Sequence, residues 1–279
     1  MARDVTRTWY RVALAKAPGE PTSVVAAAGE HMGAAIAVAE RHLPGSFAIA
    51  AEVAPDSDIP LGESLGKSSV VVVGPGGELP VFRWPVGVLP QLSRAAGAAG
   101  ARRGWIRRPH GELLVIEAQT DAEHLTDLFL GLIERLPRAD NLEVRLLEHF
   151  EDTGRADVWL TSRVDARRIL RFLDDHDVEL LGNGHLELSI YVRALKATLR
   201  LTEHKTVVWL ASEGALEADL QRWLGELAVP RVESLVTIKD VPHYHYRTAA
   251  SRDRKKLAEE LYRQRLRRVD TVKPPAVIP

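Results

Sequence analysis

The sequence predicts an α+β protein whose central unit is ferredoxin-like, with the element order βαββαβ. This prediction rests on residues 112–193. Apolar side chains there recur with the period of a strand in four segments and with the period of a helix in two, and these segments follow one another in the order given. Strand-like segments continue to residue 239 and predict an extended antiparallel sheet. A related order in the first 90 residues leaves tandem ferredoxin-like repeats open as an alternative.

Residues 1–92 are expected to form an N-terminal α/β domain with the order βαβββ. Its first strand covers residues 8–16, in which apolar side chains alternate. An alanine-rich helix is expected to start at Thr22, a good capping residue, and to end near Leu43. Further strands are predicted over residues 47–53, 69–73 and 79–84, with the turn GPGG between the last two.

Residues 93–111 are predicted to be a linker, and the domain boundary is placed there. The segment SRAAGAAGARRG consists mostly of small residues and arginine and has no large apolar side chain. A tryptophan among arginines at the end of this linker can bind nucleic acid, because guanidinium groups contact phosphates and an indole stacks on a base. The residues are Arg102, Arg103, Trp105, Arg107 and Arg108.

Residues 112–246 are predicted to form the ferredoxin-like domain with its extended sheet. Residues 113–118 are typical of a buried strand, and the next helix starts with a capping box made by Thr120 and Glu123. Its apolar face is continuous until Pro137 ends the helix. Strands over residues 142–146, 158–164, 186–193, 198–203, 206–211 and 232–239 follow, with helices that begin at Asp165 and Ser212.

Residues 247–279 are predicted to form a basic C-terminal helix and a flexible tail. This arm carries ten Arg and Lys against four Asp and Glu, a charge of +6, while the rest of the chain carries −7. An arm of this charge can bind a partner protein, contact nucleic acid or fold back on its own acidic body. The residues expected to bind a partner or phosphate are Arg254, Lys255, Lys256, Arg263 and Arg267.

His243 and His245 are the candidates for catalysis or metal binding. They lie two apart in a predicted edge strand over residues 240–247, so both side chains face one side and the intervening tyrosines face the other. Such a pair can supply two metal ligands, or an acid and a base for RNA cleavage. Spacing fixes no third ligand, although Asp240 and His204 are candidates.

Composition excludes several classes of site. The chain has 279 residues and no cysteine, which rules out disulfides, thiolate chemistry, iron–sulfur clusters and cysteine-bound zinc. It has neither an apolar run of membrane-spanning length nor a signal-peptide pattern, so we expect a soluble cytoplasmic protein that does not contact membranes.

The many arginines and alanines of the chain are typical of a GC-rich bacterial genome. No cofactor motif is present, and we expect no cofactor.

These observations favour a non-enzymatic adaptor component of a larger assembly. Its sheet edges and basic arm would bind a protein partner, and the sequence does not indicate the oligomeric state. The alternative is an RNA-binding or RNA-processing protein of the tandem ferredoxin-like type. In that protein the arginines of residues 102–108 would hold phosphates, and His243 or His245 would act as acid or base.

Overall fold

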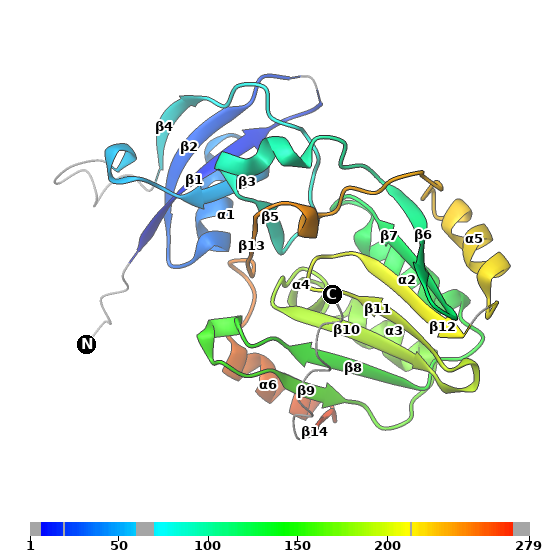
Figure 1. Cartoon of the computed structure of the whole chain (residues 1–279). Coiled ribbons are helices and arrows are strands. Elements are labelled where there is room, and N and C mark those ends of the chain that lie inside the picture. The colour runs from blue at the N-terminus through cyan, green and yellow to red at the C-terminus, as the bar shows by residue number, and fades with distance from the viewer. Residues whose placement is uncertain (1–6, 19, 60–69, 213, 270–279) are drawn as a thin grey trace.

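A computed structural model describes residues 7–18, 20–59, 70–212 and 214–269. The strands form a four-stranded sheet in the N-terminal part, an eight-stranded sheet in the rest of the chain and a two-stranded sheet between them (Figure 1). Helices pack on both larger sheets, so the α+β class is confirmed. Among the residues described, no helix combines the length and the apolar character that crossing a lipid bilayer requires.

The N-terminal sheet is built from four strands, with one α-helix and one 3-10 helix packed against it. These elements are β1 (Thr8–Ala15), β2 (Ser23–Gly29), α1 (Met32–His42), β3 (Phe47–Val53), β4 (Val70–Pro75) and η3 (Leu92–Ala98). The strand order is β3-β1-β2-β4, and all neighbours are antiparallel. Helix α1 covers one face, where Ile36 packs with Val12, and η3 covers the other, where Leu92 packs with Ala13.

The element order of this part, ββαββ, differs from the predicted βαβββ. Residues 23–29 form β2 instead of the first half of an alanine-rich helix, and no strand covers residues 79–84. β2 pairs with β1 and places Val25 in the core, so packing outweighs the small helix preference of its alanines. Gly29 then allows α1 to approach, because a Cβ on Gly29 would lie 2.5 Å from the Ala35 nitrogen.

The eight-stranded sheet contains most strands of the remaining chain. They are β6 (Gly104–His110), β7 (Leu113–Gln119), β8 (Asn141–Leu146), β9 (Asp157–Leu160), β10 (Leu186–Val192), β11 (Ala197–Leu201), β12 (Val207–Ser212) and β14 (Arg267–Val269). Their order is β14-β9-β8-β10-β11-β12-β7-β6, and all neighbours are antiparallel. An extended antiparallel sheet is therefore present, as predicted.

The strand order does not confirm the ferredoxin-like unit. In a ferredoxin-like sheet the first strand lies between the third and the fourth. Here β7, the first strand of the predicted unit, pairs with β12 and β6, whereas β10, the fourth, pairs with β8 and β11. The β11–β12 hairpin occupies the place beside β10 that the first strand would take. The tandem-repeat alternative depends on the same unit and gains no support.

Helices pack against the eight-stranded sheet. They are α2 (Leu125–Arg135), α3 (Ala166–Asp174), α4 (Asp177–Leu180), α5 (Glu217–Glu226) and α6 (Arg254–Arg263). The apolar face predicted for α2 is buried, and side chains from all of these helices belong to one core cluster with the sheet. The sheet also carries polar side chains on its other face, where Glu143 accepts hydrogen bonds from Tyr191 and Arg145.

Residues 93–111, predicted as a linker, are part of the folded structure. The first part forms η3, and the second forms β6, an edge strand paired with β7. Trp105 is only 4% exposed, and Arg231 lies over its ring. Gly104 allows this packing, since a Cβ there would lie 2.7 Å from a methyl group of Val232. The small residues that suggest a loop therefore serve close packing.

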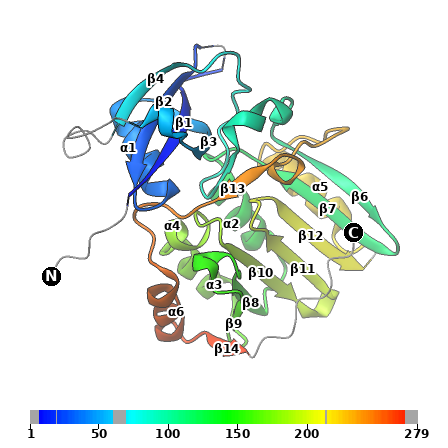
Figure 2. The ribbon, with the colours of Figure 1, turned by 60° about the vertical axis from the view of Figure 1, so that its left-hand side comes forward.

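The C-terminal arm folds back on its own body, which is one of the three arrangements its charge allows. Helix α6 begins at Arg254, which is 5% exposed, and β14 pairs with β9 at the edge of the large sheet (Figure 2). The tail from residue 270 onward lies outside the described residues. The Arg254 guanidinium donates to the carbonyls of Leu147, Phe150 and Arg155, between β8 and β9, and to the carboxylate of Asp157, the first residue of β9.

We expect Arg254→Ala to lower the free energy of unfolding by about 3 kcal/mol, because it removes the buried partner of Asp157 and the donors of three carbonyls. Urea unfolding followed by circular dichroism measures this change. The adjacent and exposed Lys255 offers a matched control, and Lys255→Ala should change stability by less than about 0.5 kcal/mol. Equal effects of the two variants would contradict the anchoring role of Arg254.

Candidate metal centre

Histidines gather at one end of the eight-stranded sheet. His149 follows β8, His185 precedes β10, and His204 lies in the turn between β11 and β12. The antiparallel pairing of these strands brings the three positions to the same end of the sheet. His243 and His245 reach this end on a strand of the two-stranded sheet, so five of the ten histidines of the chain lie together.

The two-stranded sheet holds His243 and His245 at this junction. It pairs β13 (His243–His245) with β5 (Val88–Pro90) and lies between the two larger sheets (Figures 1 and 2). Tyr244 and Tyr246 pack on the N-terminal core, and the two histidines face the other side. The structure thus shows the alternation that the sequence predicts along this strand.

Two glycines allow β13 to pass close to the end of the large sheet. The Tyr246 nitrogen donates to the Gly87 carbonyl at 2.8 Å, and the Gly184 nitrogen donates to the Tyr246 carbonyl at 2.9 Å. A Cβ on Gly184 would lie 1.9 Å from the Gly87 oxygen. Gly87 also has a φ of +106°, which residues with a Cβ rarely adopt. Neither glycine can be replaced without moving the backbone of the other, and both of them hydrogen-bond to the residue that follows β13.

Backbone carbonyls fix the orientation of both imidazole rings. His243 Nδ1 lies 2.7 Å from the Val241 oxygen, and His245 Nδ1 lies 2.8 Å from the Gly184 oxygen. A carbonyl oxygen only accepts, so both Nδ1 atoms carry a proton, and in neutral rings each Nε2 is left with a lone pair. The two Nε2 atoms lie 3.1 Å apart. Two lone pairs that face each other at this distance need a proton or a metal ion between them.

The geometry of these rings matches that of two ligands on one metal ion. Tetrahedral zinc binds imidazole nitrogen at about 2.0–2.1 Å, which places two ligand nitrogens about 3.3 Å apart. Histidines that bind metal commonly donate their second N–H to a carbonyl, as His243 and His245 do. The ring of His204 lies 5.0 and 5.1 Å from these two rings, and the three residues place ligand atoms within 4.8 Å of one another.

A second group of potential ligands shares His245. His149, Glu203 and His245 also place one ligand atom each within 4.8 Å of one another. His149 Nε2 lies 3.6 Å from a carboxylate oxygen of Glu203. This nitrogen is buried and has no hydrogen-bond partner within the described part of the chain. A bound ion or water is the usual partner of such an atom.

The site keeps several of its imidazoles neutral. Burial, with the nearby His243, lowers the pKa of His245 to about 3 and that of His204 to about 4. Burial also lowers the pKa of His149. Because a metal ion binds only the unprotonated nitrogen, these rings can bind a metal at neutral pH without first losing a proton.

Glu203 and Lys205 flank His204 and have shifted pKa values. Burial, together with the charge of Glu187, raises the pKa of Glu203 to about 7. Burial lowers the pKa of Lys205 to about 7, and its Nζ donates to the Asn183 carbonyl at 2.6 Å. Both groups therefore titrate near neutral pH, where a carboxylate can take a proton from water or a substrate.

Of the residues predicted as metal ligands, His204, His243 and His245 come together, and Asp240 lies apart from them. The Asp240 carboxylate accepts hydrogen bonds from the backbone nitrogen and the hydroxyl of Thr237. These bonds form a capping box for the 3-10 helix η6 (Ile238–Asp240). The Asp240 carboxylate thus has a structural role in the turn that precedes β13.

The basic residues predicted to bind phosphate or a partner mostly contact the body of the protein. Trp105 and Arg254 are buried in it, and Arg102 donates to a backbone carbonyl. Lys255 and Arg267 are exposed. The others pair with carboxylates of the same chain, as Arg103–Asp121, Arg107–Glu217, Arg108–Glu117, Lys256–Asp253 and Arg263–Glu260.

The sequence does not single out His149, His185 or Glu203. Each of them lies close to the end of a strand, and what brings them together is the pairing of strands that are distant in the chain. The sequence does contain a clue to them, because several predicted strands each have a histidine or a carboxylate next to one end. That clue becomes useful only when the strand order is known.

Comparison with known proteins finds no family model, no curated protein and no solved structure that matches this chain. The function is therefore inferred from the histidine geometry. The two facing Nε2 atoms, the third imidazole and the adjacent carboxylate are the features that a functional proposal has to explain.

The buried Lys205 predicts a pH dependence of stability. Its pKa is about 7 in the folded protein against 10.5 ordinarily, so between these values the unfolded chain binds a proton that the folded chain lacks. The free energy of unfolding should therefore rise as the pH increases from neutrality, and Lys205→Met should flatten the rise. Urea unfolding at a series of pH values measures both slopes, with Lys255→Met as the exposed control. Identical slopes for wild type and Lys205→Met would contradict this.

Proposed function

We propose that this protein is a metal-dependent hydrolase whose metal ion, most favourably Zn²⁺, is bound by His204, His243 and His245. The main support is the pair of Nε2 atoms 3.1 Å apart, in rings whose Nδ1 protons are held by backbone carbonyls. Three imidazoles form the ligand set of a catalytic zinc site, whereas structural zinc sites use four ligands that include cysteine. Imidazole also suits copper, iron and nickel, and it is a poor ligand for magnesium or calcium.

Three protein ligands leave a fourth position on a tetrahedral ion for water or substrate. Zinc in such a site lowers the pKa of bound water to about 7 and polarises a carbonyl or phosphoryl group. Glu203 supports a hydrolytic role by its position, because its carboxylate oxygen lies within 4.8 Å of the ligand atom of His245. It would take the proton from the attacking water, and His149, whose Nε2 lies 3.6 Å from this carboxylate, borders the same space.

The adaptor and RNA-binding roles expected from the sequence have less support in the geometry. They depend on basic side chains that are free to bind a partner, and most of these side chains pair with carboxylates of the same chain. A metal-free acid–base pair of His243 and His245 is the direct competitor, because it uses the same two rings. In that mechanism one Nε2 carries a proton, and a metal ion bound to both rings excludes this proton.

Protein that has been stripped with a chelator should bind one equivalent of Zn²⁺, as measured by isothermal titration calorimetry. His243→Ala should weaken this binding by about 100-fold or more, because it removes one of three ligands. His110→Ala, at an exposed histidine on the edge strand β6, should leave the affinity unchanged. The proposal fails if the wild type binds no metal, or if both variants bind as the wild type does.

The metal-loaded protein should hydrolyse a nitrophenyl ester or a bis-nitrophenyl phosphate, with the release of nitrophenol followed by absorbance. Glu203→Gln should retain the metal and lower kcat by about 10²- to 10⁴-fold, because the general base is lost. Glu112→Gln makes the same change at an exposed carboxylate outside the metal centre, in the turn between β6 and β7, and should leave kcat within twofold of the wild type. Activity that persists after the metal is removed and is lost in His243→Ala would favour the acid–base pair instead.

A further inference from the structure

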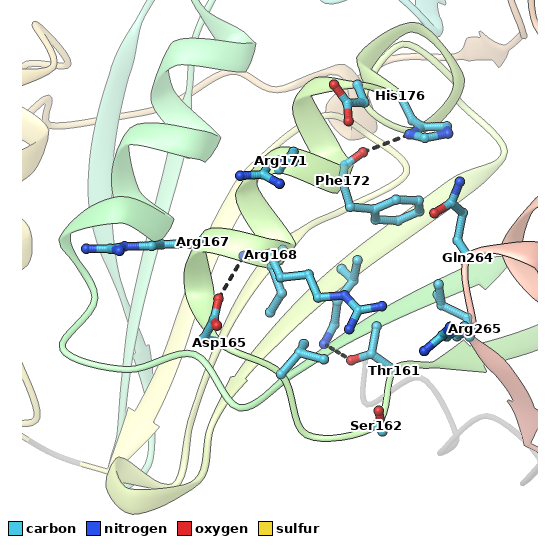
Figure 3. Close-up of a pocket in the computed structure, with 15 residues that line it drawn as sticks. Thr161, Ser162, Asp165, Arg167, Arg168, Arg171, Phe172, His176, Gln264 and Arg265 are labelled. Carbon is cyan, nitrogen blue, oxygen red and sulfur yellow. Dashed lines mark hydrogen bonds between the residues drawn. The ribbon is translucent and has the colours of Figure 1, made fainter.

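A cavity of about 580 Å³ lies between α3, the turn after α6 and the segment after β9 (Figure 3). It shares no residue with the metal centre, and its volume is within the range of about 300–1,000 Å³ that small-molecule pockets occupy. Its apolar lining includes Leu142, Ile169 and Leu266. Arginines dominate its polar lining, and they are Arg167, Arg168, Arg171 and Arg265.

The arginines of this cavity lack partners. Within the ranges that the structure describes, none of their guanidinium groups has an ion pair or a hydrogen bond. Two other cavities of the protein are lined by arginines with partners, since Arg83 pairs with Glu123, and Arg138 and Arg163 both pair with Asp140. Arg167 lines the second of these cavities as well. The four arginines are exposed side chains, and together they form a local excess of positive charge around a partly open cavity.

Two carboxylates also line the cavity, and neither neutralises these arginines. Asp165 is the N-cap of α3 and accepts from the Arg168 backbone nitrogen at 2.9 Å. Asp175 is the C-cap, at the opposite end of the helix. Neither carboxylate pairs with a guanidinium within the described part of the chain. A bound anion would supply the missing negative charge.

Two of the arginines face the cavity from opposite sides. Arg168 extends into it from α3 and Arg265 from the turn after α6, whereas Arg167 and Arg171 point away from it (Figure 3). Arg265 has a φ of +66°, a strained conformation for a residue with a long side chain, and such strain is common at ligand sites. Thr161 Oγ1 accepts from the Leu142 nitrogen at 3.0 Å, so its hydroxyl proton is free to donate into the cavity.

We infer that this cavity binds a phosphorylated small molecule of the nucleotide class. Phosphate oxygens accept bidentate hydrogen bonds from the guanidinium groups of Arg168 and Arg265 and a further one from the Thr161 hydroxyl. The phosphate also removes the repulsion between two like charges that face one space. Phe172 lines the same cavity, with its ring near Gln264 (Figure 3), and this ring offers a surface on which the base packs.

The test is isothermal titration calorimetry of the full chain with ATP, AMP, adenosine and pyrophosphate. A chelator is present throughout, so that the nucleotides do not bind through a metal ion at the histidines. We expect ATP to bind and adenosine not to bind. Arg168→Gln and Arg265→Gln should each weaken the binding of ATP by at least about tenfold, because each removes a charged donor.

Arg167→Gln is the matched control, because it makes the same change on the neighbouring residue of the same helix, whose side chain points away from the cavity. It should leave the affinity for ATP unchanged, and circular dichroism confirms that each variant is folded. If pyrophosphate binds as tightly as ATP, the cavity binds phosphate groups but does not recognise a base, and the nucleotide part of the inference is overturned. The inference is overturned if no phosphorylated probe binds, or if Arg167→Gln weakens binding as much as Arg168→Gln does.

Discussion

The placement of β13 between the two larger sheets is the constraint on which the rest of the structure depends. Its tyrosines pack in the N-terminal core, and its histidines face the end of the eight-stranded sheet. Its backbone pairs with β5 and continues into hydrogen bonds with Gly87 and Gly184, between which no Cβ would fit. Gly184 also accepts from His245, so the contact that joins the two halves of the fold orients an imidazole as well.

Other elements bring the remaining groups to the same place. The β11–β12 hairpin is what makes the strand order of the eight-stranded sheet differ from that of a ferredoxin-like sheet. The turn of this hairpin carries Glu203 and His204. The segment between β8 and β9 carries His149, and the buried Arg254 of the C-terminal arm holds this segment through the carbonyls of Leu147 and Phe150. The position of the β11–β12 hairpin beside β10, which departs from the ferredoxin-like strand order, and the arm folded back on the body therefore both support the histidine cluster.

Local patterns predict local structure, and pairing at long range decides the rest. The apolar face of α2 and the alternation of His243 and His245 follow from helix and strand periods, and both are present. The prediction for β2 is wrong because its alanines favour a helix in isolation, whereas in the protein they form a strand that pairs with β1. Glu203 and His149 are not predicted as site residues because the pairing of β8, β10 and β11 brings them together. No local period of the sequence encodes this pairing.

Anomalous diffraction at the zinc edge, from crystals grown with Zn²⁺, tests the metal centre most directly. The geometry predicts one peak at about 2.0–2.1 Å from the Nε2 atoms of His243 and His245, with His204 as the third ligand. Both Nδ1 atoms should keep their bonds to the carbonyls of Val241 and Gly184. Nε2 atoms that stay in direct contact, with no peak between them, would contradict the metal centre and identify a shared proton instead.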